Sequence, residues 1–195
     1  MRLDDREWKA FSIEELFLTI KRGNKRYLPT GMLADKSLIS NGHTPRISAT
    51  SQNNGIAFFH NASASDDFRK VNKCLTLSFL GDVFYQNTTV TLDMKIHALV
   101  LKDIAMNKYI GLFLKTVVRM QTYGITYGNQ LSSADAVSKK ILLPVTNSGE
   151  PDYQFMEDYI RELMERKRKQ YVQYAEKQLK ELEKTNKIFG GGTHL

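Results

Sequence analysis

Several features that would place a protein outside the cell or in a membrane are scarce or missing here. The sequence contains one cysteine, Cys74, so it cannot form an internal disulfide. It has no run of roughly 18 apolar residues, the length that a membrane-spanning helix needs. The first residues are mixed and acidic, without the apolar segment of a secretory signal. We therefore expect a protein of the reducing cytoplasm that has no membrane partner.

Motifs for catalysis and cofactor binding are missing as well. There is no glycine-rich phosphate loop, no dinucleotide fingerprint, and no pair of histidines or cysteines at metal-ligand spacing. Cys74 lies in an apolar segment that alternates with period two, which favours a buried strand over a nucleophile. We therefore expect a chain that is not an enzyme and binds no cofactor or metal.

A small metal-dependent nuclease remains as an alternative. Asp152, Glu165 and Lys167 follow the order of a loose nuclease motif. That chemistry needs carboxylates that converge on neighbouring strands, whereas Asp152 and Glu165 lie roughly 20 Å apart on one predicted helix. Metal-dependent cleavage by the purified chain would establish this alternative. Two other acidic pairs remain open for the same role: Asp66 with Asp67, and Asp82 with Asp93.

The positive charge of the chain is concentrated in one stretch. The formal net charge is +7, and residues 21–73 alone hold nine Lys or Arg against three Asp or Glu. A local surplus of this kind indicates a polyanionic partner. A solvated loop surface would explain the charge equally well if charge were the only observation.

Residues 1–150 have the pattern of an α+β domain. Short segments rich in β-branched and aromatic residues, between 74 and 101 and again at 140–145, predict strands. Residues 107–119 have apolar side chains at helical spacing, and residues 12–16 read as a capped helical turn. Asn53-Asn54-Gly55 predicts a turn before a buried strand at 56–59. We expect a mixed, largely antiparallel, bent sheet.

Residues 151–188 predict one long helix, and residues 189–195 a flexible tail. Residues 152–188 contain neither glycine nor proline, and a helix of this length would span roughly 55 Å. A single helix cannot bury an apolar stripe against itself, so we expect a coiled coil that forms a homodimer. The residues predicted to lie in that interface are Phe155, Tyr159, Ile160, Leu163, Tyr171, Tyr174 and Leu182.

Side-chain chemistry selects candidate DNA contacts. Lysine and arginine neutralise phosphates, and the amides of asparagine and glutamine pair with adenine in the major groove. For the polar loop at 50–54 the alternative reading is turn chemistry alone. The candidates are Lys21, Arg22, Asn24, Lys25, Arg26, Tyr27, Arg46, Thr50, Gln52, Asn53, Asn54, Lys70, Lys73, Gln86 and Asn129.

The order of short motifs resembles that of a known family. Residues 42–56 are similar to a "G-x-x-P-x-I-s-a-t…N-N-G-i" segment, and residues 81–86 to the glycine–aspartate strand that follows it. Residues 123–132 and 141–144 resemble a "Y-x-x-g-x-k-l-s" stretch and a closing "I-x-L-P" strand, after which a long helix opens at 151–160. This is the order in DNA-specificity subunits of type I restriction–modification systems and of related type II enzymes.

The resemblance implies a fold and a function. Such subunits have two target recognition domains joined by two long antiparallel helices; each domain reads half of a split DNA site, and the helices dock the modification subunits. One domain and one helix imply a half-subunit that dimerises, or a part of a larger protein. Methylation and cleavage, with S-adenosylmethionine and Mg²⁺, would belong to partner subunits. A module that assembles with proteins and does not bind DNA remains a second alternative.

Overall fold

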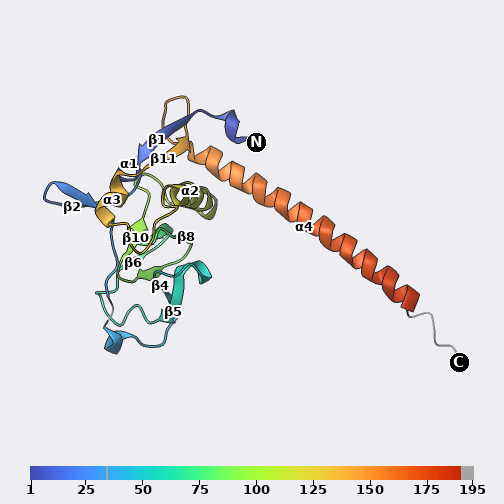
Figure 1. The fold of residues 1–195 in the computed structure, drawn as a ribbon, viewed down its shortest axis with the longest axis horizontal. Helices are drawn as coiled ribbons and strands as arrows, with labels where there is room; N and C mark the ends of the chain where they lie inside the picture. Colours follow the sequence, from blue (N-terminus) through green and yellow to red (C-terminus); the bar gives the residue numbers. More distant parts are fainter. Residues whose placement is uncertain (34, 190–195) are drawn as a thin grey trace.

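A mixed domain of strands and short helices carries one long helix that projects away from it (Figure 1). The computed structural model describes residues 1–33 and 35–189. The tail predicted at 189–195 therefore lies, except for its first residue, outside the described residues.

The main core is built around an antiparallel sheet of order β10-β7-β8. Its strands are β7 (Cys74–Ser78), β8 (Val83–Gln86) and β10 (Ile96–Leu99). All five residues of β7 are buried, so the period-two pattern in the sequence does not mark a solvent face. Burial raises the pKa of the Cys74 thiol to about 12, which agrees with the predicted core role of this residue.

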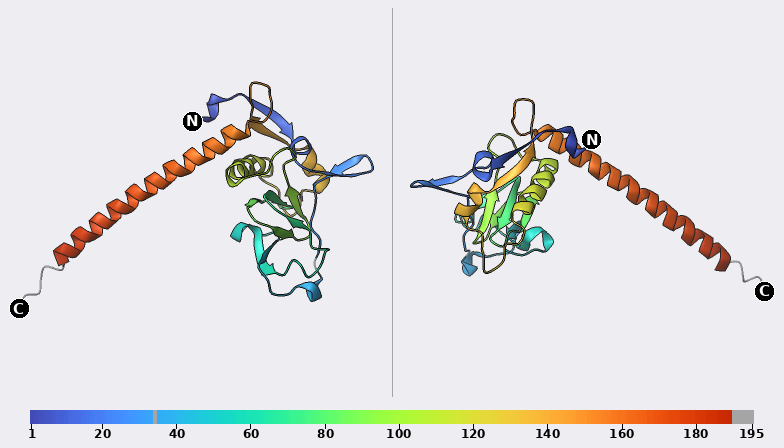
Figure 2. Two further views of the ribbon diagram at one scale, coloured as in Figure 1. Left: turned by 180° about the vertical axis from the view of Figure 1, so that it is seen from behind. Right: turned by 45° about the horizontal axis from the view of Figure 1, so that its top comes forward.

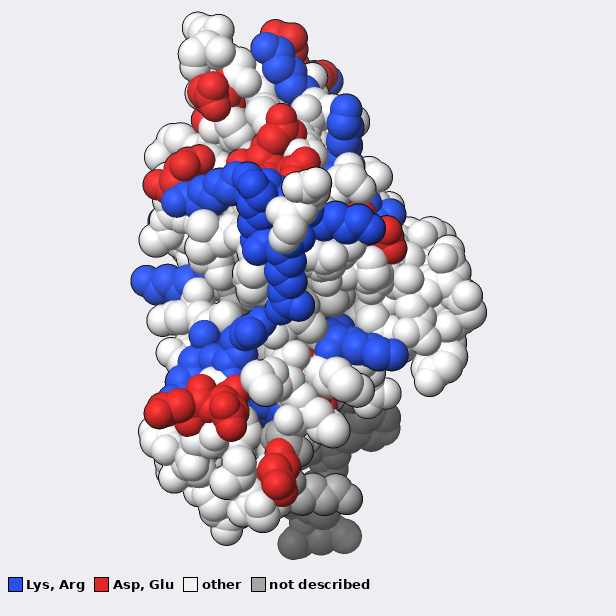
Figure 3. Space-filling view, turned by 90° about the vertical axis from the view of Figure 1, so that its left-hand side faces the viewer, with Lys and Arg blue, Asp and Glu red and all other residues white. Residues whose placement is uncertain are grey.

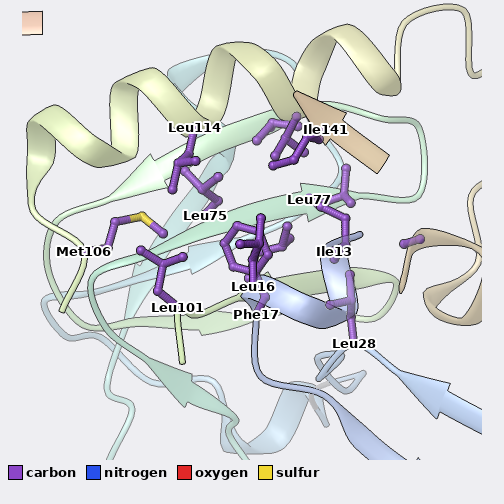
Figure 4. Packing of buried hydrophobic residues seen from close by; sticks show 14 of the residues in the cluster. Ile13, Leu16, Phe17, Leu28, Leu75, Leu77, Leu101, Met106, Leu114 and Ile141 are labelled. Atoms are coloured by element: carbon purple, nitrogen blue, oxygen red, sulfur yellow. The ribbon is translucent and has the colours of Figure 1, made fainter. Parts of the chain in front are cut away.

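Helix α2 (Lys108–Gln121) packs against this sheet. Asn107 caps it, since its side chain accepts from the backbone N–H groups of Tyr109 and Ile110 at 2.9 and 3.0 Å. Leu114 of α2 lies close to Leu75 of the sheet in the core (Figure 4). The helix predicted over residues 107–119 is confirmed.

The chain start is tied to the last strand. β1 (Trp8–Ser12) pairs antiparallel with β11 (Lys140–Pro144). Ser12 and Glu15 form a capping box on α1 (Ile13–Leu16), as the sequence predicts. Helix α3 (Ser133–Ser138), which the sequence pattern did not predict, leads into β11.

A second sheet has the order β5-β4-β9-β6. Its strands are β4 (Thr44–Ile47), β5 (Ile56–His60), β6 (Lys70–Val71) and β9 (Val90–Leu92). The β4–β9 pairing is parallel and the others are antiparallel, so the predicted mixed, largely antiparallel class is confirmed. The buried strand predicted at 56–59 is an edge strand, because β5 pairs only with β4; Phe59 is 56% exposed.

The remaining elements are short, apart from the last helix. β2 (Ile20–Arg22) and β3 (Lys25–Tyr27) form a separate hairpin. Single 3₁₀ turns span Leu3–Asp5 (η1), Lys36–Leu38 (η2) and Asn53–Gly55 (η3).

Helix α4 (Tyr153–Phe189) is attached to the domain by its first turns. Asp152 accepts from the backbone N–H of Phe155 at 2.9 Å and from Nε of Arg6 at 2.9 Å, so it caps the helix start. Phe155 and Met156 are 2% and 0% exposed, whereas most described side chains beyond residue 160 are exposed. Figure 2 shows the far part of α4 standing clear of the domain in both views.

The close packing of α2 on β8 gives a stability prediction. A Cβ added to Gly111 would lie 2.3 Å from Cδ2 of Tyr85, whose ring is held by a hydrogen bond from its hydroxyl to the Met106 carbonyl at 3.3 Å. We expect Gly111→Ala to lower the free energy of unfolding by about 1–3 kcal/mol, because overpacking outweighs the gain in helix propensity. Urea denaturation measures this. Gly128→Ala is the control, since no atom lies within 4 Å of its Cβ position; equal losses in both variants would contradict the prediction.

Candidate nucleic-acid interface

The β2–β3 hairpin concentrates positive charge. Its register places Lys21 opposite Arg26 and Arg22 opposite Lys25. Residues directly opposite in an antiparallel pair share one face, so each face of the hairpin carries two like charges, an arrangement that destabilises a sheet. All four side chains are exposed. Four of the candidate DNA contacts therefore form a two-sided basic hairpin that an anion would stabilise.

The turn of the hairpin is short and open. Gly23 has a φ of +60° and no atom within 4 Å of its Cβ position. Asn24 is exposed beside it. The hairpin is braced at its base. Arg26 donates to Oγ1 of Thr19 at 2.9 Å and lies 3.8 Å from a carboxylate oxygen of Glu14, and Arg22 lies 5.7 Å from the ring centre of Tyr27.

Basic side chains form a band across the face from which the hairpin projects (Figure 3). At the hairpin base, a hollow of about 370 Å³ is lined by residues that include Arg22, Thr30 and Arg69. Arg69 donates to the Thr30 carbonyl, which holds its guanidinium at this hollow. Arg69 is not among the predicted contacts, although it lies within the basic stretch at 21–73. The hollow offers two guanidinium groups to an anion, so it extends the basic face beyond the hairpin.

Arg46 does not belong to this face, and its predicted DNA contact is wrong. Its side chain is 2% exposed and pairs with Asp93 at 3.0 Å. It also donates to the Met32 carbonyl at 2.6 Å and lies 5.6 Å from the Phe68 ring centre. Burial, followed by the Arg46 charge, lowers the pKa of His60. Arg46 is thus an internal charge that joins the second sheet to the backbone at Met32.

Gln86 is also internal, and its predicted base contact is wrong. It is 3% exposed and donates to the Asn54 carbonyl at 3.0 Å and to Oγ1 of Thr76 at 3.1 Å. The Asn54 amide in turn donates to the Tyr85 carbonyl at 3.0 Å. Asn53 and Asn54 have φ of 49° and 55°, so this loop uses asparagine as turn chemistry, the alternative that the sequence left open.

The other candidates fall into separate places. Gln52 and Asn53 are exposed and Thr50 is half-buried, but their loop lies on the opposite side of the domain from the hairpin (Figures 1 and 2). Lys70 is exposed on β6, at the other edge of the second sheet. Lys73 is exposed as well, two residues after the end of β6. The structure therefore does not bring all the exposed candidates onto one face.

Asn129 lies in an exposed loop that also contains Tyr123 and Tyr127, which are 85% and 75% exposed. Arg119 lies 6.0 Å from the ring centre of Tyr123, and Tyr127 makes an edge contact with Phe79 at 6.2 Å. This loop is a second polar and aromatic surface next to a cation.

Comparisons with known proteins identify one family. The model of the type I restriction modification DNA specificity domain matches residues 5–174. The chain belongs to this family. It is 31% identical over 162 residues to the type II restriction enzyme BgcI specificity subunit S.BcgI of Heyndrickxia coagulans, and the match covers 81% of this chain. The chain spans 44% of that relative's length.

Solved structures agree in fold with this assignment to the DNA specificity domain family. The S subunit of a type I restriction–modification system from M. genitalium matches 76% of this chain and 37% of its own, with a TM-score of 0.54 and 14% identity. The HsdS subunit from Thermoanaerobacter tengcongensis matches 82% and 38%, with a TM-score of 0.53 and 13% identity. A structure of a type I R-M system described for its complex assembly matches 91% and 44%, with a TM-score of 0.58 and 17% identity.

The acidic residues that suggested a nuclease do not converge in this specificity domain. Asp152 caps α4, while Glu165 pairs with Arg168 at 2.9 Å farther along the same helix. The carboxylates of one of the two other acidic pairs face arginines: Asp82 pairs with Arg119 at 3.7 Å, and Asp93 pairs with Arg46. The described residues contain no group of three or more His, Cys, Asp or Glu placed to hold a metal ion. Within residues 1–33 and 35–189, no helix is long and apolar enough to cross a membrane.

The residues predicted for dimerisation divide into two sets. Phe155 is buried in its own domain beneath the Arg6 guanidinium, at 5.1 Å, so its predicted role in an interface is wrong. Tyr159 and Ile160 are half-buried, and the Tyr159 ring meets Phe113 edge-on at 6.1 Å. The rest of the predicted stripe stands away from the domain: Leu163, half-exposed, and Tyr171, Tyr174 and Leu182, exposed.

The internal role of Arg46 can be tested separately from DNA binding. We expect Arg46→Ala to lower the free energy of unfolding by about 2 kcal/mol, because it removes the buried guanidinium that bonds the Met32 carbonyl and packs on Phe68, together with its pair with Asp93. Lys70→Ala, at an exposed site on an edge strand of the same sheet, should change it by less than about 0.5 kcal/mol. Urea denaturation measures both. An Arg46→Ala variant as stable as Lys70→Ala would show that the buried pair contributes nothing.

Proposed function

We propose that this chain reads double-stranded DNA sequence as the specificity component of a restriction–modification complex. Membership of the DNA specificity domain family supports the proposal, and the basic β2–β3 hairpin carries it. Two like-charged pairs on a thin, exposed hairpin are stabilised when phosphates neutralise them. In this proposal Lys21, Arg22, Lys25 and Arg26 bind phosphates, and Asn24 at the turn reads a base edge.

We also propose that α4 joins two such domains. A helix of about 55 Å with exposed tyrosine and leucine side chains needs a second helix to cover them. Two copies related by a two-fold axis would present two hairpins to one duplex and read a symmetric, split site. Methyltransferase subunits would bind to this assembly in the cytoplasm, and those partners would supply S-adenosylmethionine and Mg²⁺ for methylation and cleavage.

DNA binding is tested by replacing Lys21, Arg22, Lys25 and Arg26 with alanine. We expect the plot of log binding constant against log salt concentration to become shallower by about 0.9 for each phosphate that is no longer neutralised, or by about 3.6 if all four side chains bind DNA. Fluorescence anisotropy with a duplex at several salt concentrations measures the slope.

A matched control removes the same charge elsewhere. Arg166, Lys167, Arg168 and Lys169 on α4 are exposed, and alanine at all four should leave the slope near its original value. Equal slope changes in the two variants would indicate binding by net charge alone. An unchanged slope in the hairpin variant would place the DNA surface elsewhere.

Self-association is tested by ending the chain before Tyr171. We expect the full chain to sediment as a dimer and the shortened chain as a folded monomer, because Tyr171, Tyr174 and Leu182 are removed while the domain core is kept. Analytical ultracentrifugation and circular dichroism measure mass and folding. A full chain that sediments as a monomer at tens of micromolar would show that α4 binds a different protein.

A further inference from the structure

Most arginines of this chain are paired with carboxylates. The sequence has ten arginines, and seven of them form an ion pair with Asp or Glu. In the part of the chain that the structure describes, Arg22, Arg69 and Arg166 have no such pair. Arg166 lies on the exposed part of α4, whereas Arg22 and Arg69 line the same hollow at the base of the β2–β3 hairpin. Two uncompensated cations that meet in one hollow indicate a site for an anion.

Arg69 is held in position from both ends. Its backbone carbonyl accepts from the Leu92 N–H at 3.2 Å, and its guanidinium donates to the Thr30 carbonyl. Phe68, the residue before it, is 4% exposed. A guanidinium has five N–H donors, so the bond to Thr30 leaves donors for a ligand. An anion that binds here does not have to order the Arg69 side chain, a cost that a flexible surface arginine would add.

The floor of the hollow is fixed to the sheets behind it. Gly31 packs against the end of β9, because a Cβ added there would lie 2.2 Å from the Asp93 carbonyl oxygen. The Thr30 hydroxyl donates to the Leu28 carbonyl at 3.1 Å and lies 3.0 Å from Nδ1 of His97, which is 4% exposed. These contacts lie within the protein, so the floor keeps its shape whether or not a ligand is bound.

The rest of the lining suits a phosphate group. None of the described residues that line the hollow is acidic, and Ser133 and Tyr27 add half-buried hydroxyl groups. The hollow of about 370 Å³ is much larger than the roughly 30 Å³ that one water molecule occupies, so a phosphate fits with the sugar atoms attached to it. A backbone phosphate carries one negative charge on two non-bridging oxygens, which matches two guanidinium groups.

We propose that this hollow binds one backbone phosphate of the DNA duplex, with Arg69 and Arg22 each bonding one of its non-bridging oxygens. The inference rests on the DNA recognition proposed above and adds a contact at the hairpin base that does not depend on base sequence. Contacts to phosphates set the position and orientation of a duplex without reading it. Because Arg69 and the floor are fixed to the sheets, the bound phosphate places the duplex at a set position relative to the hairpin turn.

The salt dependence of DNA binding tests this phosphate site, because its slope counts neutralised phosphates rather than cations. Arg22→Ala or Arg69→Ala alone leaves one guanidinium on the phosphate, so each should weaken the binding of a labelled mixed-sequence duplex with little change in slope. The double variant Arg22→Ala/Arg69→Ala removes both and should make the slope shallower by about 0.9. Fluorescence anisotropy at several salt concentrations measures all three variants.

The matched control is Arg166→Ala/Arg168→Ala, which removes the same charge from exposed positions of α4 and should leave the slope unchanged. A loss of about 1.8 in the Arg22/Arg69 double variant would indicate two separate phosphates. A double variant that binds as Arg22→Ala does would show that Arg69 contacts no DNA. Either result overturns the proposal. An original chain without salt-dependent DNA binding would instead contradict the recognition function itself.

Arg69→Gln controls for folding, since it removes the charge but keeps an N–H group that can donate to the Thr30 carbonyl. Combined with Arg22→Ala, it should keep the original thermal unfolding and give the same slope loss as alanine. A slope restored by glutamine would show a structural effect and overturn the proposal.

Binding of a free anion is tested with inorganic phosphate, compared with chloride at equal ionic strength. We expect no difference between the two salts in the thermal unfolding of the original chain, because the site takes its phosphate from the duplex. A higher Tm in phosphate, together with an unchanged DNA slope in the Arg22/Arg69 double variant, would assign the hollow to a free anion and overturn the proposal.

Discussion

The anchoring of α4 by two buried side chains controls the geometry of the whole molecule. Phe155 and Met156 lie in the domain core, and the Arg6–Asp152 pair closes over the helix start. The domain, rather than any partner, therefore sets the direction in which α4 leaves. Because an α-helix advances by a fixed 1.5 Å per residue, that direction carries over to the far end of the helix.

The positive charge of the domain serves two physical purposes that composition does not separate. Arg46 is removed from water and connects the second sheet to the backbone at Met32. The hairpin arginines and lysines stay exposed, facing like charges across a two-stranded ribbon. Arg46 is paired inside the protein, whereas the four hairpin cations stay exposed at the surface, where Arg26 lies 3.8 Å from Glu14. Burial therefore distinguishes the structural Arg46 from the exposed cations that are proposed to bind DNA.

The sequence predicts elements well where the signal is local. The capping box at Ser12, the helix predicted over residues 107–119 and the long helix after residue 152 all depend on interactions within a few residues, and they are confirmed. The predictions that are wrong depend on contacts with residues far away in the sequence. The exposure of Phe59 follows from the edge position of β5, and no feature of residues 56–60 reports which strand lies beside them.

The same limit applies to the candidate site. From its sequence context, Gln86 is a candidate for reading a base. Its side chain instead bonds the Asn54 carbonyl and Thr76, which are 32 and 10 positions away in the sequence. Phe155 has the spacing of an interface residue but packs inward. The charges of the hairpin could be recognised as a cluster because they are adjacent in sequence, and their role in DNA binding stays a prediction. Arg69 was missed because only folding brings it to the hollow beside Arg22.

The hairpin is attached to the domain at its base and has open space at its tip. Most of the described cluster of buried side chains lies elsewhere, so residues 22–25 can change length or composition at little cost to folding. Under the proposed function, stability and DNA recognition belong to different parts of the fold. New DNA preferences would then arise through changes in a few tip residues while the sheets and the helix stay constant. For engineering, the hairpin is the natural position at which to graft or randomise sequence.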